Sequence, residues 1–236
     1  MCVIAVSLKG KKFSEDDLRE MWNANPHGAG LAWIKGSEVY VVKGLMKFDD
    51  LLEVYENVPK GVMHALHFRL RSAGEILPQL THPFRIDVID TQQLKYKAKQ
   101  VLFHNGTVSD WRSLYFAVLS SLRKKDKEKV LSVKSVSDTY VIALAVHKFG
   151  HQILKHLDIG GKWLIFGPEP VFYGSWDDDK RNGFKFSNLS WKLSYDFGLG
   201  RSSYGYKSYS TGWKGSSCDI TCSWYQKDSD DKDDEI

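Results

Sequence analysis

Met1-Cys2-Val3-Ile4-Ala5-Val6-Ser7-Leu8 opens the chain and predicts a buried strand preceded by a thiol. The stretch from Val3 to Leu8 is apolar and rich in β-branched residues, as buried strands are. Removal of Met1 would place a free α-amine on Cys2. A thiol attacks as the thiolate, and an α-amine with a pKa near ~8 can accept its proton. The alternative is that Cys2 is a small buried hydrophobic residue, so the rest of the sequence must decide.

The composition predicts one catalytic-sized domain followed by a tail. A chain of 236 residues with 42% hydrophobic residues can bury one substantial core. We expect the domain to span residues 2–190. Residues 191–236 become rich in Ser, Gly and Tyr and then acidic, and we expect them to form a flexible tail. The formal net charge of +4 is therefore the sum of a basic body and an acidic end.

The sequence has features of a cytoplasmic protein. Val3 to Leu8 is too short for a signal peptide, and no later run reaches membrane-spanning length, so no membrane partner is expected. Three cysteines, an odd number, fit a reducing compartment. Cys218 and Cys222 could pair or bind metal, but their spacing alone is a weak zinc signal, and we expect neither metal nor organic cofactor.

A basic run at residues 123–129 is the strongest candidate for nucleic-acid contact. Acidic residues interrupt it, and no aromatic stacking pattern accompanies it. We therefore expect a solvated helix end or loop and no nucleic-acid partner.

The order of elements predicts an α+β protein with largely antiparallel sheets. Strands come first, a block of helices follows, and strands return towards the end. The predicted strands are at residues 3–8, 31–34, 38–42, 61–69, 101–103, 162–166, 171–173 and 184–187. One predicted helix begins after the N-cap Ser14, and three others span residues 48–55, 111–122 and 137–149.

Four short motifs follow Cys2. Arg69 ends a predicted buried strand in His67-Phe68-Arg69, where a guanidinium needs an anionic partner. His104-Asn105-Gly106 is a turn whose amide and backbone N–H groups can face an oxyanion. The others are Ser137-Asp138-Thr139, which opens a helix, and Asn25-Pro26-His27-Gly28-Ala29-Gly30. Each has an ordinary structural explanation when taken alone.

Together with Cys2, these motifs resemble the class II glutamine amidotransferases. That family begins with a catalytic Cys exposed by Met removal and has H-T-R-W-A-T-H-G, H-N-G and S-D-T segments in this order. The resemblance runs from Cys2 to about Trp191, with Thr81-His82-Pro83-Phe84 and Phe186-Ser187-Asn188 as further matches. It is strongest with stand-alone domains, many of them encoded by bacteriophages. It implies a four-layer αββα sandwich of the N-terminal nucleophile hydrolase type.

The resemblance also implies a role for each residue. Cys2 is the nucleophile and its α-amine the base. Asn105 and the Gly106 N–H form the oxyanion hole. Arg69 binds the α-carboxylate of glutamine and Asp138 its α-ammonium. The implied reaction releases ammonia from the glutamine amide for a separate acceptor synthetase and hydrolyses a γ-glutamyl thioester.

The segment after Arg69 departs from the family pattern. Leu70-Arg71-Ser72-Ala73 stands where Trp-Ala-Thr-His is usual, so Ser72 keeps a hydroxyl while Arg71 adds a cation. A larger γ-glutamyl amide with additional negative charge is therefore an alternative substrate. Two other functions remain open: a free-standing γ-glutamyl amide hydrolase without a partner, and a catalytically idle domain of the same fold used for binding or as a scaffold.

Overall fold

A computed structural model describes residues 1–72, 75–157, 161–180 and 182–192. They lie in the first of two compact units, Met1–Asp196. The second unit, Phe197–Ile236, lies outside the described residues, as do Cys218, Cys222 and the expected flexible tail beyond Lys192.

The first strand of the chain is an interior strand of a seven-stranded sheet. Every pair of neighbouring strands in this sheet is antiparallel. The register pairs Val3 with Phe68, so the strand after Cys2 lies beside the strand that ends before Arg69. The strand order is β10 (Asp177–Asp179), β11 (Phe184–Phe186), β1 (Val3–Ser7), β4 (His64–Phe68), β2 (Ala29–Lys35), β3 (Glu38–Leu45) and β6 (Lys95–Ala98).

A second sheet has four antiparallel strands. At its centre, β7 pairs with β8 so that His104 lies opposite Trp163 and Asn105 opposite Lys162. The strand order is β5 (Phe84–Arg85), β7 (Val101–Asn105), β8 (Lys162–Phe166) and β9 (Val171–Tyr173).

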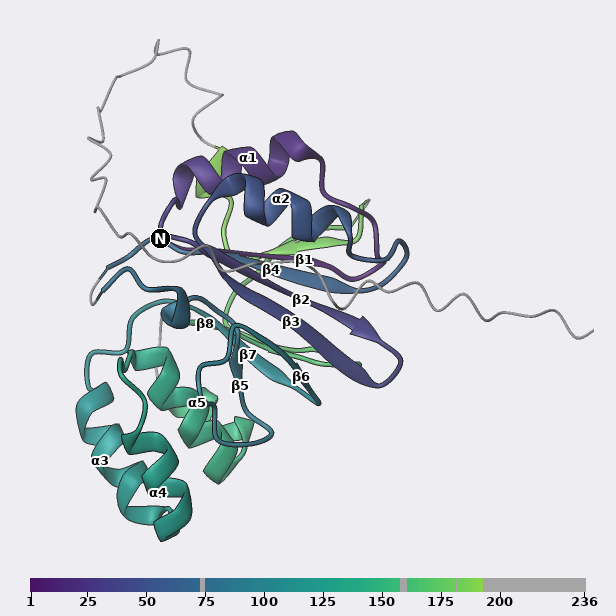
Figure 1. The fold of residues 1–236 in the computed structure, drawn as a ribbon. Coiled ribbons are helices and arrows are strands. Elements are labelled where there is room, and N and C mark those ends of the chain that lie inside the picture. The colour runs from purple at the N-terminus through teal and green to yellow at the C-terminus, as the bar shows by residue number, and fades with distance from the viewer. Residues whose placement is uncertain (73–74, 158–160, 181, 193–236) are drawn as a thin grey trace, which may run out of the picture. The chain divides into compact units, whose positions relative to one another are not determined.

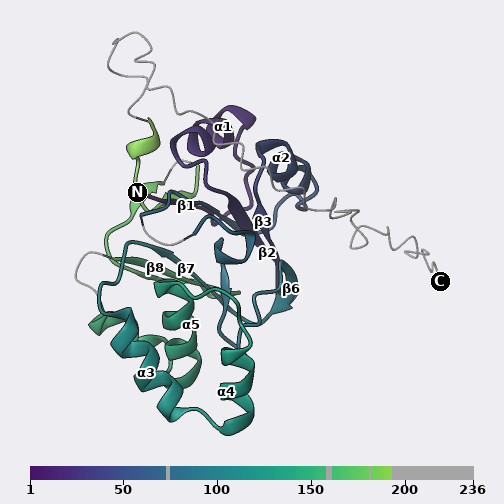
Figure 2. The ribbon, with the colours of Figure 1, turned by 60° about the vertical axis from the view of Figure 1, so that its left-hand side comes forward.

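Helices cover the outer faces of the two sheets (Figures 1 and 2). The first two pack on the seven-stranded sheet, and the other three α-helices lie on the side of the four-stranded sheet. The helices are α1 (Glu15–Ala24), α2 (Phe48–Glu56), α3 (Trp111–Ser121), α4 (Lys124–Leu131) and α5 (Asp138–Phe149), with short 3₁₀ turns at Pro78–Leu80, His151–His156 and Ser190–Lys192.

Alternation along the strands produces three apolar layers. Val3 and Ala5 of β1 face α1 and α2, whereas Ile4 and Val6 face the gap between the sheets. In β7, Leu102 faces the helices on its side, while its neighbours on either side face the gap. The fold is therefore the expected four-layer αββα sandwich, and the predicted antiparallel α+β class is confirmed.

Most predicted elements form close to their expected bounds. Ser14 caps α1 as predicted, because its hydroxyl accepts from the Asp17 backbone N–H and the Asp17 side chain accepts from the Ser14 N–H. The sequence did not predict β5, β6 or β10. In β6 two lysines alternate with buried residues, so its composition resembles a loop although its period is that of a strand.

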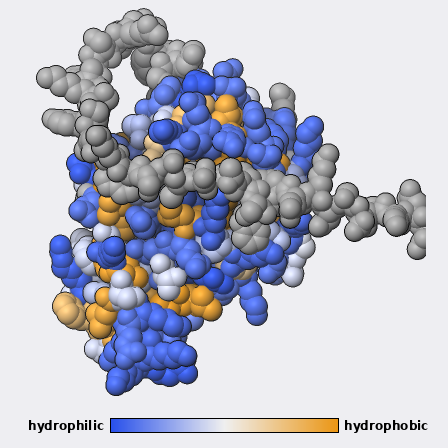
Figure 3. All heavy atoms as spheres, in the orientation of Figure 1, coloured by the Kyte–Doolittle hydropathy of each residue, from blue (hydrophilic) through white to orange (hydrophobic). Residues whose placement is uncertain are grey.

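The basic run forms most of a separate helix, α4, with Arg123 at its N-cap. The expected solvent exposure is confirmed, since most of the run is exposed and the surface over α4 is hydrophilic in Figure 3. None of the helices in the described part of the chain combines the length and apolar composition of a membrane-spanning helix.

Candidate active site

Three strands direct polar residues into one end of the gap between the sheets. Cys2 continues the alternation of Ile4 and therefore shares its gap-facing side. Arg69 likewise continues the alternation of Ala65 at the end of β4. Asn105 has the same parity as Phe103 in the opposite sheet. The two sheets thus bring residues that are distant in sequence to the same end of the sandwich.

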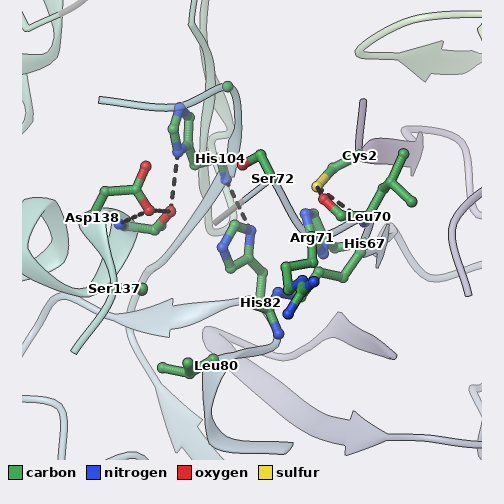
Figure 4. Close-up of a pocket in the computed structure, with 13 residues that line it drawn as sticks. Cys2, His67, Leu70, Arg71, Ser72, Leu80, His82, His104, Ser137 and Asp138 are labelled. Carbon is green, nitrogen blue, oxygen red and sulfur yellow. Dashed lines mark hydrogen bonds between the residues drawn. The ribbon is translucent and has the colours of Figure 1, made fainter. Parts of the chain in front are cut away.

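A pocket opens at this end of the sandwich (Figure 4). Figure 4 shows Cys2, Leu70 and Arg71 on one side and Ser137 and Asp138 on the other. Five of the six predicted site residues line the pocket, and the sixth, Asn105, does not. The lining residues are Cys2, His67, Arg69, Leu70, Arg71, Ser72, Leu80, His82, His104, Gly106, Ser137, Asp138 and Thr139.

The Cys2 thiol contacts both backbone polar groups of Leu70. Its S–H donates to the Leu70 carbonyl at 3.3 Å, and its Sγ accepts from the Leu70 N–H at 3.3 Å. Burial raises the pKa of Cys2, while the Leu70 N–H and the nearby Arg69 cation act in the opposite direction. A thiol with a raised pKa is mostly protonated near neutrality, so its reaction as a nucleophile requires a base. The α-amine in the structure belongs to Met1, whose side chain is exposed.

Arg69 supplies a largely buried cation, only 8% exposed. Its Nη2 donates to the Glu75 carbonyl at 2.9 Å, whereas Nη1 is buried without a partner among the described residues. The loss of hydration lowers its pKa, and the main compensating charges are Cys2 and Asp138. An unpaired guanidinium N–H at a pocket favours an anionic ligand.

Asp138 is the first residue of α5, directly after the N-cap Ser137. Its two carboxylate oxygens accept from the Val108 N–H at 3.0 Å and from the Thr139 N–H at 2.7 Å. These bonds fix the carboxylate at the pocket. It is the only acidic side chain among the lining residues and can receive a cationic group.

Asn105 and Gly106 end β7 in different environments. The Asn105 side chain is 4% exposed, and its Nδ2 donates to Ser187 Oγ at 2.9 Å. Gly106 lines the pocket with φ +156°, and a Cβ there would lie 2.7 Å from His104 Nε2. A side chain at residue 106 therefore conflicts with both the backbone conformation and the buried imidazole.

The loop after Arg69 contributes the remaining polar groups. Ser72 is exposed, and its hydroxyl lies 3.1 Å from Thr107 Oγ1. The Arg71 N–H donates to His27 Nδ1 at 2.9 Å, which joins this loop to the turn before β2. Ala73 lies outside the described residues.

Three buried histidines, to which the sequence motifs assign no role, form part of the pocket wall. His67 and His82 lie with ring centroids 4.0 Å apart, and the His104 N–H lies 3.4 Å from His82 Nδ1. Burial lowers the pKa of His67 and of His104 to about 3, so both are neutral near neutrality. Each of these histidines stands in or beside a sequence motif, which is the only local signal for it. Its burial depends on contacts between the two sheets.

A second set of missed contacts comes from the segment after β11. Ser187 Oγ accepts from the Ile4 N–H at 2.9 Å as well as from Asn105. Asn188 Nδ2 donates to the Cys2 carbonyl at 2.8 Å. Within the residues that the structure describes, no group of three or more His, Cys, Asp or Glu side chains is arranged to hold a metal ion.

The architecture defines the chain as a protein of the N-terminal nucleophile hydrolase fold. It is similar, over 79% of its length, to the glutamine phosphoribosylpyrophosphate amidotransferase from B. subtilis complexed with ADP and GMP, with 15% identity and a TM-score of 0.50. The match covers 41% of that enzyme, so this chain spans less than half of its length. At this identity, the similarity establishes the fold.

Two other solved structures have lower TM-scores. One is a glutamine aminotransferase class-II domain protein from Silicibacter pomeroyi, with 14% identity, a TM-score of 0.41, and coverage of 78% of this chain and 87% of that one. The other is the allosteric regulatory enzyme of purine biosynthesis, with 19% identity, a TM-score of 0.43, and coverage of 71% and 35%. No protein-family model and no curated protein matches the chain.

Proposed function

We propose that the protein is a glutamine amidotransferase-type hydrolase with Cys2 as its nucleophile. One observation supports this proposal: four residues from four separate segments line the same pocket, namely Cys2, Arg69, Gly106 and Asp138. The fold shared with the B. subtilis amidotransferase adds to it. The catalytic domain is proposed to span residues 2–190, with residues 191–236 as an appended tail.

Substrate binding follows from the two opposite charges at the pocket. The unpaired Nη1 of Arg69 binds the α-carboxylate of glutamine, and Asp138 binds the α-ammonium. Ser72 supplies a hydroxyl at the pocket edge. A zwitterionic amino acid held at both charges extends its side-chain amide towards Cys2.

The first chemical step requires removal of Met1. The new α-amine of Cys2 takes the thiol proton, and the thiolate attacks the amide carbon of glutamine. The Gly106 N–H and the Asn105 amide stabilise the resulting oxyanion. The C–N bond then breaks as the leaving nitrogen takes the proton from the Cys2 ammonium, which yields ammonia and a γ-glutamyl thioester.

The second step releases glutamate. Water attacks the thioester carbon and gives a proton to the α-amine. The C–S bond breaks, and the sulfur recovers that proton as the thiol re-forms. The ammonia passes to a separate acceptor enzyme in this proposal, and the chemistry requires no metal or organic cofactor.

One observation favours a second candidate, a free-standing hydrolase of γ-glutamyl amides. Arg71 adds a second guanidinium to the pocket lining, whereas the lining has a single carboxylate, that of Asp138. A substrate whose amide nitrogen carries a carboxylate-bearing group would add a negative charge beside Arg71. Such a substrate needs no acceptor enzyme.

Intact mass and product analysis test the proposal together. We expect the purified protein to lack Met1 and to release glutamate and ammonia from glutamine. Cys2→Ala should abolish turnover, whereas a Cys218→Ala, Cys222→Ala variant, which removes the other two thiols, should retain it. Faster turnover of γ-glutamyl amino acids than of glutamine would favour the second candidate. Retained Met1 in an active protein would refute the amine mechanism, and absence of Cys2-dependent turnover on both substrates would favour an idle binding domain.

A further inference from the structure

The segment after β11 contacts both parts of the proposed catalytic machinery. Ser187 is fully buried, and its Oγ lies 2.9 Å from both the Ile4 nitrogen and the Asn105 side-chain amide. The Ser187 N–H also donates to the Ile4 carbonyl at 2.9 Å. Its neighbour Asn188 donates to the Cys2 carbonyl at 2.8 Å. Ser187 therefore joins the strand that carries the nucleophile to the strand that carries the oxyanion donor.

Hydrogen-bond counting limits the orientation of the Asn105 amide. A serine hydroxyl has one proton to donate as well as lone pairs that accept. The Ile4 N–H already uses one lone pair of Ser187. If Asn105 also donates, none of the hydrogen bonds among the described residues uses the Ser187 proton. A half-turn of the Asn105 amide exchanges its oxygen and nitrogen at nearly the same positions, and the buried hydroxyl then has an acceptor.

We propose that Ser187 is a positioning residue that acts through Asn105. Its hydroxyl donates to Asn105 Oδ1 while it accepts from the Ile4 N–H. This arrangement releases both N–H groups of Asn105 Nδ2 from Ser187, so that they are available to the oxyanion formed at Cys2. The inference rests on the proposed function, because it assigns Asn105 its part in that reaction.

In this arrangement Ser187 holds the Asn105 amide in place across the gap between the two sheets before the reaction begins. An oxyanion donor is effective when it is held in place before charge develops. Without Ser187, the Asn105 side chain keeps its burial but loses the group that fixes its rotation. A donor that rotates between two orientations stabilises the transition state less well, whereas it has less effect on substrate binding. We therefore expect a fall in kcat that is larger than the change in KM.

A double-mutant cycle tests this role. Ser187→Ala should lower kcat by roughly 10-fold or more with KM nearly unchanged, and it should add no further loss in an Asn105→Ala background. Ser7→Ala is the matched control, because Ser7 is equally buried in β1 but its hydroxyl donates to the Lys11 carbonyl. Equal kcat losses from Ser187→Ala in both backgrounds would indicate a purely structural role and overturn the proposal.

An NMR measurement keeps the test independent of catalysis. The side-chain amide signals of Asn105, assigned with an Asn105→Asp variant, should shift in Ser187→Ala and stay unchanged in Ser7→Ala. The Asn105 amide protons should show little or no nuclear Overhauser contact with Ser187, because in the proposed orientation they point away from its hydroxyl. A strong Overhauser contact between an Asn105 amide proton and Ser187 would mean that Nδ2 donates to Ser187, which would overturn the proposed orientation. If glutamine is not hydrolysed, the proposed function fails while the amide signals still decide the role of Ser187.

Discussion

The Asp138 carboxylate accepts a hydrogen bond of 3.0 Å from the Val108 N–H, and this bond ties the start of α5 to the segment after Gly106. The other carboxylate oxygen accepts from the Thr139 N–H. The proposed ammonium-binding group is therefore also part of the support for the oxyanion turn. Its replacement should affect both stability and substrate binding.

Asp138→Asn tests this double role. An amide has only one acceptor oxygen, so its NH₂ group would face one of the two backbone N–H donors. We expect a loss of about 1 kcal/mol in the free energy of unfolding. The KM for glutamine should rise at least ~10-fold, because the α-ammonium loses its anionic partner. Urea unfolding and steady-state kinetics measure the two effects, and an unchanged KM would remove Asp138 from the substrate site.

Arg69→Met should separate binding from stability. The folded protein buries the Arg69 cation with one nitrogen that has no partner among the described residues, and a methionine has similar length without the charge. Removal of an incompletely paired buried charge should leave the free energy of unfolding unchanged or raise it by about 1 kcal/mol. Binding of glutamine should nevertheless be lost, as measured by KM or calorimetry. A strongly destabilised variant would show that Arg69 serves mainly to hold the fold.

Gly106→Ala should be more damaging than an ordinary glycine substitution. The added Cβ would lie 2.7 Å from His104 Nε2 and 3.2 Å from the Gly161 Cα, at φ +156°. We expect a loss of about 2 kcal/mol in stability and a large fall in kcat, because the turn N–H moves. Gly36→Ala is the control: φ is +62° there, and no described atom lies within 4 Å of the added Cβ. Equal thermal shifts for the two variants would contradict the predicted clash.

Mild acid should destabilise the fold through the buried histidines. Burial lowers the pKa of His67 and of His104 to about 3 in the folded state, below the ordinary value near 6.5 in the unfolded chain. The unfolded chain therefore binds more protons between these values. The stabilisation is fully present above pH ~6.5 and is lost as the pH falls towards 3.

The expected size is about 2 kcal/mol at pH 5 for each histidine that stays neutral when folded. Urea midpoints at pH 7 and pH 5 provide the measurement. His104→Gln removes one titrating group and should make the pH dependence of the free energy of unfolding shallower. A stability that is the same at both pH values would contradict the predicted burial of neutral imidazoles.

The sequence predicted most of the elements because their local signals are strong. Apolar β-branched runs specify β1, and an N-cap followed by acidic residues specifies α1. The lysines of β6 hide its period of two, so its sequence does not predict a strand. The charges of α4 hide its short helical segment, so its sequence predicts only a helix end or loop. In both elements the deciding apolar contacts are made with distant segments.

The site residues likewise divide into those that local motifs predict and those that only contacts between distant segments identify. The short motifs and the family resemblance predicted five site residues that all line one pocket: Cys2, Arg69, Ser72, Gly106 and Asp138. Asn105 was predicted as well, but its contact with Ser187 spans 82 residues of sequence. The histidine cluster and the bond between Asn188 and the Cys2 carbonyl had no local signal that identified them.

The sequence by itself determined the strand alternation and the chemical groups at the strand ends, because both depend on neighbouring residues and on side-chain type. Only the tertiary structure decided which groups meet, because the two sheets bury their facing residues against each other. That packing buries the Cys2 thiol and the Arg69 guanidinium, and so shifts the pKa of each. Local sequence specifies the polar groups at the strand ends, and desolvation between the sheets shifts the pKa of Cys2 upward and that of Arg69 downward.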